Sequence, residues 1–336
     1  MARNCGEQEG GLRSKCCVPA LVVAAGMLLG VDTDGVAQTY PDHSVRMIIA
    51  FAAGGTIDTL GRIIAQKLGE AWGQTVVVEN RGGAGGNIGA IAAAQAAPDG
   101  YTLHLGAQSL GVNVTIAPAK GFNPVEDFDP IMWVATAQDV LMVPTGSPFK
   151  SVPDLIAYAK AHPGELNYAS LGIGSSGHLA TVLFSDLAGI KLQHVPYSSY
   201  SQAVTDVTSG VLSLWITTLG GALPNIQAAR MRALAVSGRA RAAQLPDVPT
   251  FNEMGVAFVD ETSWYALFAP KGTPKEIIGK INANMARILV DPDMKERETT
   301  LGFRFIGGPP EKLDAMLKSE IARWAEVARS ASLVTK

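Results

Sequence analysis

Phe51-Ala52-Ala53-Gly54-Gly55-Thr56-Ile57-Asp58 is the stretch on which the fold prediction rests. Before it, residues 45–50 form a short apolar run with β-branched residues, which is typical of a buried strand. After it, apolar residues recur at helical spacing. The two glycines allow a sharp turn, and either Thr56 or Asp58 can cap the helix that follows. A strand, a glycine turn and a helix N-terminus together predict a binding site for a small anion.

The composition predicts a globular α/β protein of one or two domains. The 336 residues are 47% hydrophobic and 17% charged, which is enough for a sizeable core. The formal net charge of −3 argues against a nucleic-acid partner, which would need a basic face. Cys5, Cys16 and Cys17 are the only cysteines, so no disulfide, thiolate metal site or cysteine nucleophile is expected after them.

The first 37 residues have the order of a secretory signal peptide. Basic residues precede an apolar run at 18–29, and Gly35-Val36-Ala37 offers a small-residue cleavage site. The run is too short to span a bilayer, which takes about 20 apolar residues. We therefore expect cleavage near Ala37-Gln38 and a periplasmic mature protein. A non-cleaved anchor is the alternative, and a lipoprotein is disfavoured because no lipobox precedes the cysteines.

The order of strand, polar glycine loop and helix occurs twice along the chain. The first set includes the glycine-rich loop at 81–87, and the second includes a loop at 170–178. Strands that alternate with helices imply parallel sheets, and ligands then collect at the carboxyl ends of the strands. The sequence therefore predicts two lobes, each with a mostly parallel sheet flanked by helices and each with a loop that faces the same ligand.

The last third of the chain is expected to return to the first lobe. Helical patterns follow residue 275, and the first lobe would otherwise have too few covering helices. Two chain crossings, near 136–140 and 258–262, would form a hinge beside a ligand cleft. The predicted division is a signal peptide at 1–37, lobe 1 at 38–138 plus 259–336, and lobe 2 at 139–258.

Separate segments carry a family resemblance: Phe51…Gly54-Gly55…Asp58, Val78-Glu79-Asn80-Arg81…Gly83-Ala84-Gly85-Gly86-Asn87, Ala97-Pro98-Asp99-Gly100-Tyr101-Thr102-Leu103, Leu166-Asn167-Tyr168-Ala169-Ser170, His194-Val195-Pro196-Tyr197 and Leu245-Pro246-Asp247-Val248-Pro249-Thr250. In this order they resemble the tripartite tricarboxylate transporter receptors, also called Bug proteins. The resemblance spans about residues 40–331. It implies a two-lobed periplasmic-binding-protein fold, type II-like, that closes on a small carboxylate or related solute. It also implies delivery of that solute to the membrane permease subunits of a tripartite transporter.

The chain departs from the family pattern at positions that bear on the ligand. Alanines stand at 52 and 53, where the family usually has prolines. Ser198-Ser199 replaces a common Lys-Gly, and Ser213 and Thr217 replace common aspartates. Loss of these charged residues disfavours a ligand with an ammonium group, so we expect a non-amino mono- or dicarboxylate. Valine at Gly55 or Gly174 is expected to abolish binding by filling the site.

The resemblance implies that the ligand contacts come mainly from the loops at 51–58 and 170–178. The candidate ligand-binding residues are Phe51, Ala53, Gly54, Gly55, Thr56, Asp58, Gln108, Ser109, Ser170, Gly172, Gly174, Ser175, Ser176, His178, Tyr197 and Thr217.

Several of these residues have a structural interpretation beside the functional one. Asp58 is favoured as a helix cap, since a carboxylate would repel an anion. His178 is favoured as a hydrogen-bonding partner at a helix start. Arg81 either pairs with the ligand carboxylate or bonds neighbouring backbone carbonyls. Tyr197 either forms a wall of the cleft or, as a tyrosine at a strand end, belongs to the core.

Two other functions stay open at this point. A periplasmic sensor subunit of a signalling system would use the same closing receptor. An enzyme with a nucleotide cofactor is weaker: Gly83-x-Gly85 opens a helix, but Ile88 stands where the dinucleotide fingerprint needs glycine. The sequence also lacks a convincing nucleophile–base pair, and the histidines lack metal-ligand spacing. We expect no enzymatic activity, no cofactor, no metal and a monomer.

Overall fold

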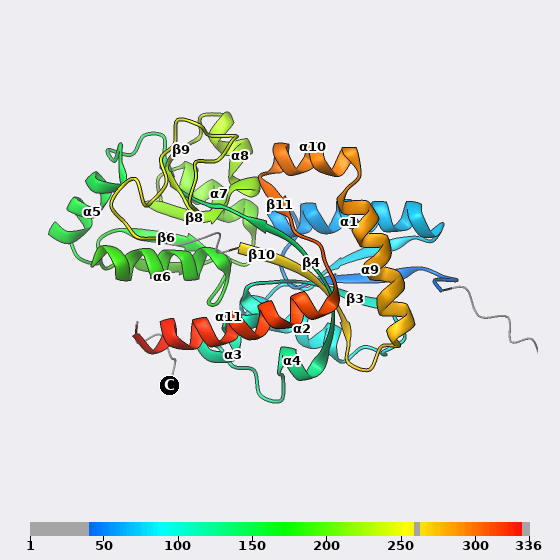
Figure 1. Ribbon diagram of the computed structural model, residues 1–336. Coiled ribbons are helices and arrows are strands. Elements are labelled where there is room, and N and C mark those ends of the chain that lie inside the picture. Colours follow the sequence, from blue (N-terminus) through cyan, green and yellow to red (C-terminus); the bar gives the residue numbers. More distant parts are fainter. Residues whose placement is uncertain (1–39, 259–262, 331–336) are drawn as a thin grey trace, which may run out of the picture. The chain divides into compact units, whose positions relative to one another are not determined.

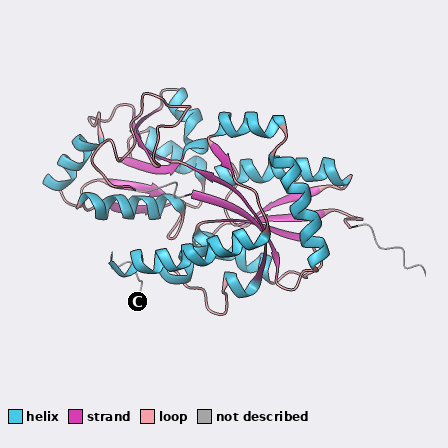
Figure 2. Ribbon diagram, in the orientation of Figure 1, coloured by secondary structure: helices cyan, strands magenta, loops and turns pink. Residues whose placement is uncertain are grey.

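The computed structural model describes residues 40–258 and 263–330, with side chains up to residue 326 (Figure 1). The predicted signal peptide and most of the second chain crossing lie outside these residues. Within them, two β-sheets flanked by helices carry the fold (Figure 2). We name each sheet with its covering helices a lobe. The exact lobe boundaries given above stay a prediction.

The first sheet has six strands in the order β2-β1-β3-β10-β4-β11. Strand β1 pairs in parallel with β2 and β3, whereas β10 is antiparallel to β3 and β4, and β11 is antiparallel to β4. The bounds are β1 Val45–Ile49, β2 Val76–Asn80, β3 Thr102–Ala107, β4 Phe128–Ala137, β10 Ser263–Pro270 and β11 Phe303–Phe305.

The second sheet repeats this arrangement with five strands in the order β7-β6-β8-β5-β9. Strand β6 pairs in parallel with β7 and β8, and β5 is antiparallel to β8 and β9. The bounds are β5 Asp139–Pro144, β6 Asn167–Ser170, β7 Gln193–Pro196, β8 Leu214–Thr218 and β9 Met231–Val236.

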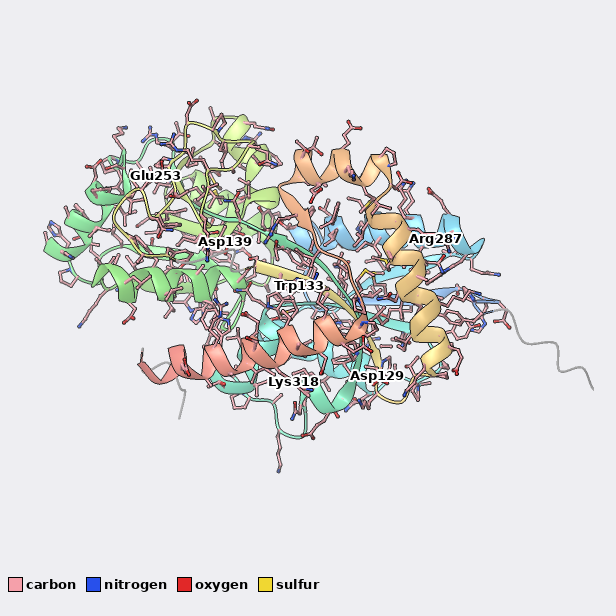
Figure 3. All side chains as sticks on the ribbon, viewed as in Figure 1. Asp129, Trp133, Asp139, Glu253, Arg287 and Lys318 are labelled. Atoms are coloured by element: carbon pink, nitrogen blue, oxygen red, sulfur yellow. The ribbon has the colours of Figure 1, made fainter. Side chains whose placement is uncertain are left out.

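Both sheets are therefore mixed, and only the half built around β1 or β6 is parallel as predicted. The antiparallel strands include those that carry the chain between the lobes. Strand β4 is followed by β5 after the single residue Gln138, without a crossover helix. The rule that makes consecutive strands parallel holds for two strands of one sheet joined by a crossover helix. It does not apply here, because β4 and β5 belong to different sheets and no helix joins them. Asp139 begins β5 at this crossing, fully buried (Figure 3), and accepts a hydrogen bond from Ser263 Oγ at 2.9 Å.

Helices cover both sheets, and the late helices return to the first lobe as expected. α9 and α11 both pack against β4, and α9 also packs against α1. The helices of the first lobe are α1 Thr56–Trp72, α2 Asn87–Ala94, α3 Ser109–Ile116, α4 Pro124–Asp127, α9 Lys275–Leu289, α10 Pro292–Leu301 and α11 Pro310–Ser330. Those of the second are α5 Val152–Ala161, α6 Ser176–Ala188, α7 Tyr200–Thr208 and α8 Leu219–Gln227.

Each lobe has its own apolar core, and a small cluster joins them. In that cluster, Val112 and Ile116 of α3 pack with Leu179 of α6 and Trp324 of α11, each 2% exposed or less. Because α6 belongs to the second lobe and the others to the first, burying these side chains requires the lobes to be in contact. The joining cluster therefore favours a closed arrangement.

A buried histidine in the first core makes the stability depend on pH. His104 on β3 is 1% exposed and hydrogen-bonds the Ile48 carbonyl at 3.0 Å through Nδ1. Burial lowers its pKa from 6.5 to about 4, although the bond to Ile48 opposes this. As the pH falls below 6.5, the unfolded chain takes up the proton first. The contribution of His104 to the free energy of unfolding is therefore complete above pH 6.5, and it is lost as the pH falls from there to about 4.

We predict that the free energy of unfolding falls across this pH window, with a contribution from His104 of about 3 kcal/mol at its lower end. Denaturant unfolding at a series of pH values measures it. His104→Gln should flatten the slope in this pH window. An unaltered slope in His104→Gln contradicts the assignment.

Candidate functional site

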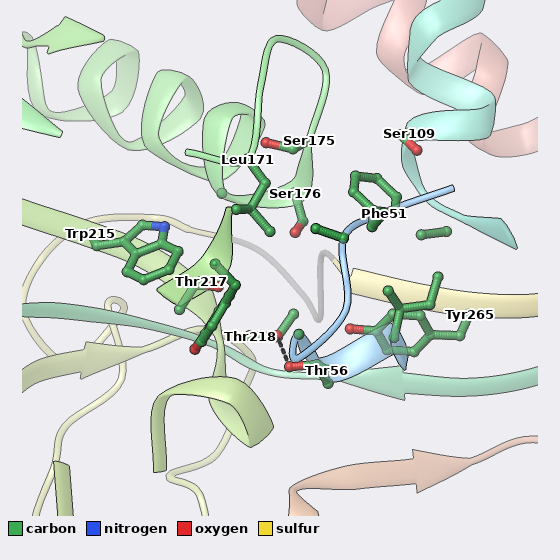
Figure 4. A pocket seen from close by; sticks show the side chains of 16 residues that line it. Phe51, Thr56, Ser109, Leu171, Ser175, Ser176, Trp215, Thr217, Thr218 and Tyr265 are labelled. Carbon is green, nitrogen blue, oxygen red and sulfur yellow. Dashed lines mark hydrogen bonds between the residues drawn. The ribbon is translucent and has the colours of Figure 1, made fainter. Parts of the chain in front are cut away.

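A cavity of about 50 Å³ lies where the two lobes meet (Figure 4). Among its described lining residues there is no acidic, basic or histidine side chain. The predicted site residues that line it are Phe51, Gly55, Thr56, Ser109, Ser175, Ser176 and Thr217. The lining residues that the prediction missed are Ala52, Ile57, Ala107, Leu171, Gly177, Tyr200, Trp215, Thr218 and Tyr265.

Of the described helices that begin at this cavity, four have no side-chain cap. Thr56 of α1, Ser109 of α3 and Ser176 of α6 are the first helical residues, and Thr218 is the N-cap of α8; all four line the cavity. By contrast, α4, α5 and α10 begin away from the cavity, and a side chain caps each of them. α7 also begins at the cavity, with Tyr200, but the Ser199 side chain caps it. The first-turn N–H groups of these four helices therefore have no side-chain cap and can meet a ligand. The exceptions are Leu219 of α8 and Gly111 of α3, whose N–H groups bond the Gln138 and Gln108 carbonyls.

The uncapped helix starts give the cavity a positive potential without a charged side chain. Each helix N-terminus carries a partial positive charge of roughly half a unit from its aligned peptide dipoles. Backbone N–H groups at such a terminus hydrogen-bond anions well. The cavity can therefore hold an anion through backbone donors and the hydroxyls of the lining.

Asp58 fixes the first loop from outside the cavity. Thr56 and Asp58 were predicted to cap α1, but the N-cap is Gly55 and no side chain caps it. Instead, the Asp58 carboxylate accepts the N–H of Gly54 at 2.9 Å and pairs with Arg62 at 3.0 Å. Burial raises the pKa of Asp58, but the bonds from Arg62, Gly54 and Asn80 outweigh it and hold the pKa below 3.8. The carboxylate therefore stays ionised and holds the glycine turn in place.

Hydroxyl groups connect the lobes at one wall of the cavity. Thr56 Oγ1 of the first lobe lies 2.5 Å from Thr218 Oγ1 of the second, the pair joined by a dashed line in Figure 4. Thr218 also hydrogen-bonds the phenol of Tyr265, whose pKa is raised by burial. The Tyr200 phenol donates to the Gly221 carbonyl at 2.6 Å. These neutral hydroxyls fix the wall and add no charge to it.

The second loop is held by two histidines and a serine. His178 Nδ1 accepts the N–H of Gly174 at 3.4 Å, and Ser170 Oγ lies 2.6 Å from His194 Nε2. Burial, with a smaller effect from His194, lowers the pKa of His178 to about 4, so its ring is neutral at pH 7. His178 and Ser170 do not line the cavity. They support the loop, as the structural interpretation of His178 expected.

Glycines allow the loops of the two lobes to touch. A Cβ on Gly174 would come within 1.9 Å of Asn113 Oδ1, and one on Gly85 within 1.9 Å of the Ile173 carbonyl. Gly174 also has a φ of +82°, which other residues rarely adopt. Gly174 does not line the cavity, and a valine there would first meet Asn113 of the first lobe. Gly55 does line it, and a Cβ there has room.

The remaining candidates lie around the cavity and not in its lining. Gly172 and Tyr197 line a larger neighbouring groove. Gln108 is 1% exposed and does not line the cavity, although its neighbours Ala107 and Ser109 do. Ala53 and Gly54 are exposed at the tip of the first turn. Arg81, expected as the nearest positive charge, donates to Glu79 at 2.6 Å and lines neither space.

Two kinds of site are absent from the described residues. No group of three or more histidine, cysteine or acidic side chains there could hold a metal ion. Nor does that part of the chain contain a helix with the length and hydropathy of a membrane span.

Comparisons with known proteins agree on one family. The model of the tripartite tricarboxylate transporter family receptor matches residues 60–333. The solved periplasmic binding protein BugD is 31% identical, with a TM-score of 0.84 over 88% of this chain and 100% of its own. An R. palustris structure with adipate is 35% identical, with a TM-score of 0.84 over 87% and 98% of the two chains. MatC from Rhodopseudomonas palustris with bound malate is 31% identical, with a TM-score of 0.81 over 86% and 99%.

We predict that Gly174→Ala holds the lobes apart, because its Cβ collides with Asn113 across the lobe contact. Small-angle scattering should show a larger radius than for the unaltered chain. Gly164→Ala is the matched control: its φ of +78° imposes the same strain of about 1 kcal/mol, but its Cβ would meet nothing within 4 Å. If Gly174→Ala and Gly164→Ala have the same radius in solution, the predicted role of the Gly174–Asn113 contact is wrong.

Proposed function

We propose, from the premise that this chain belongs to the tripartite tricarboxylate transporter receptor family, that it is a periplasmic receptor that captures a small carboxylate between its two lobes. The observation that carries the proposal is the meeting of four uncapped helix starts at one uncharged cavity. A carboxylate has two oxygens that can accept several such N–H donors at once. Charge-assisted hydrogen bonds of this kind are stronger than neutral ones.

The same arrangement disfavours ligands that carry an ammonium group. Helix N-termini repel cations, and no lining carboxylate is present to receive one. The hydroxyl of Thr217 stands where an aspartate is common in the family, so the chain has lost a partner for an amino group. We therefore place the ligand among non-amino organic acids. Adipate and malate, which the two R. palustris structures contain, are members of that class.

The receptor binds its ligand without converting it. The Ser175 hydroxyl donates to the Gly172 carbonyl at 2.7 Å, and the ring of His178 is engaged by Gly174. A serine nucleophile would need an adjacent free base, and these hydrogen bonds leave neither group in that role. A pure sample should therefore return its bound acid unaltered.

Delivery to a membrane transporter completes the proposed role. The matching family is named for the receptors of a tripartite transporter. In that role the exported monomer closes over its ligand, and the closed form is recognised by the membrane permease subunits. The predicted signal peptide, with cleavage near Ala37-Gln38, would bring the chain to the periplasm.

A thermal-shift screen of organic acids, amino acids and sugars tests the ligand class. For a ligand present at 100 times its dissociation constant, the stabilisation is about 2.7 kcal/mol. In a protein of this size that raises the melting temperature by several degrees, on the order of 2–4 °C per kcal/mol. We expect the organic acids to give this rise. A rise with sugars and none with carboxylates contradicts the anion site.

A single substitution tests the electrostatic basis of selection. Thr217→Asp places a negative charge in the lining, where it should weaken binding of a non-amino carboxylate at least about tenfold, or ~1.4 kcal/mol. Thr217→Asn has nearly the same shape and no charge, so it controls for the change of size. Isothermal titration measures both. If the two variants bind equally well, the potential of the cavity does not select the ligand.

A further inference from the structure

A second, larger space continues from the anion cavity. This groove has a volume of about 1010 Å³ and shares Phe51, Ala52 and Leu171 with the lining of the cavity. In Figure 4, Phe51 and Leu171 come from opposite lobes beside the cavity. The walls of the groove likewise come from both lobes. A molecule longer than the cavity can therefore extend past these shared residues into the groove.

Unlike the cavity, the groove has few groups that could bind a charged part of a ligand. No acidic, basic or histidine residue is among its described lining. Asn87 Nδ2 donates to the Ala117 carbonyl at 2.8 Å, and the Tyr197 phenol donates to Asp206 at 2.7 Å. The two main polar side chains of the lining are thus already engaged.

Helix α2 begins at the groove, but its first amides are also occupied. A short 3₁₀ turn, Ala84–Gly86, precedes the helix. The N–H of Gly86 bonds the Gly83 carbonyl, and the N–H of Asn87 bonds the Ala84 carbonyl. Two of the backbone donors at this helix start are therefore engaged within the turn.

Two large apolar side chains stand exposed at the groove, one on each lobe. Ile88 of α2 is 53% exposed and Ile173 of the second loop is 45% exposed, and both line the groove. Exposed apolar surface of this kind is covered favourably by an apolar molecule. Because the groove adjoins the anion cavity, the apolar group that covers it would belong to the same ligand.

Resting on the proposed function, we infer that the groove is a subsite for an uncharged apolar tail. The carboxylate of the ligand occupies the cavity, and its chain passes between Phe51 and Leu171 to cover Ile88 and Ile173. The ligand class narrows to monocarboxylates with an apolar chain. A second carboxylate at the far end would find no cation among the described lining residues of the groove.

Isothermal titration with straight-chain monocarboxylates from propanoate to octanoate tests the subsite. Once the chain is long enough to reach the groove, each added methylene should tighten binding about fourfold, which corresponds to ~0.8 kcal/mol per buried methylene. Dicarboxylates of equal length should bind at least about tenfold more weakly, since the second charge must be desolvated.

Ile88→Ser removes the apolar surface on the first lobe. It should weaken octanoate binding about fivefold or more, roughly the loss of one to two buried methylenes, and change propanoate binding less than about twofold. Val77→Ser is the control, because Val77 is 50% exposed on the same lobe and does not line the groove. It should leave the whole series unchanged.

Three outcomes overturn the subsite. A series with equal affinities at every length shows that the groove serves another occupant, while the proposed carboxylate receptor survives. Preference for dicarboxylates likewise rejects the apolar tail and keeps the receptor. If no acid of any length binds, both the subsite and the proposed function fail.

Discussion

Free backbone N–H groups at helix starts are the constraint on which the rest of the site depends. A buried N–H group without a partner costs about 1–3 kcal/mol. The structure gathers four uncapped helix starts around one cavity between the lobes. Closing the lobes over an empty cavity would leave such donors unsatisfied by protein. In the proposed receptor a bound carboxylate would satisfy them, so ligand binding and lobe closure would favour each other.

The topology explains how four helix starts come to one place. β1, β3, β6 and β8 are each followed along the chain by one of the helices α1, α3, α6 and α8. β1 and β3 are parallel neighbours, as are β6 and β8, so their carboxyl ends lie at the same edge of each sheet. The contacts of Gly85 and Gly174 then bring the two edges together. The repeated half-sheet thus supplies the donors, and the glycine contacts set their spacing.

The sequence predicted the parts of this arrangement that local patterns encode. The glycine loops before Thr56 and Ser176 marked two of the four helix starts, because each stands between an apolar strand and a helical pattern. The starts of α3 and α8 were missed, since each follows its strand without a glycine loop. The β-branched residues of α3 also obscure its helical period.

Other features depend on contacts between distant segments, which a local pattern does not contain. Tyr265 was not among the predicted site residues, because nothing in β10 shows which of its faces meets the second lobe. Gly174 was assigned to the ligand site, although it makes room for Asn113. Trp215 could have been predicted from Thr217. The two residues lie two positions apart on β8, so they share a face of the strand, and both line the cavity.

Amide hydrogen exchange with and without a bound organic acid tests the central claim most directly. The account predicts slower exchange at the first-turn amides of α1, α3, α6 and α8 when the acid is bound. The first turns of α5 and α10, which begin away from the cavity and have side-chain caps, should change little. Binding that leaves the four uncapped starts unprotected would contradict the claim that backbone donors hold the ligand.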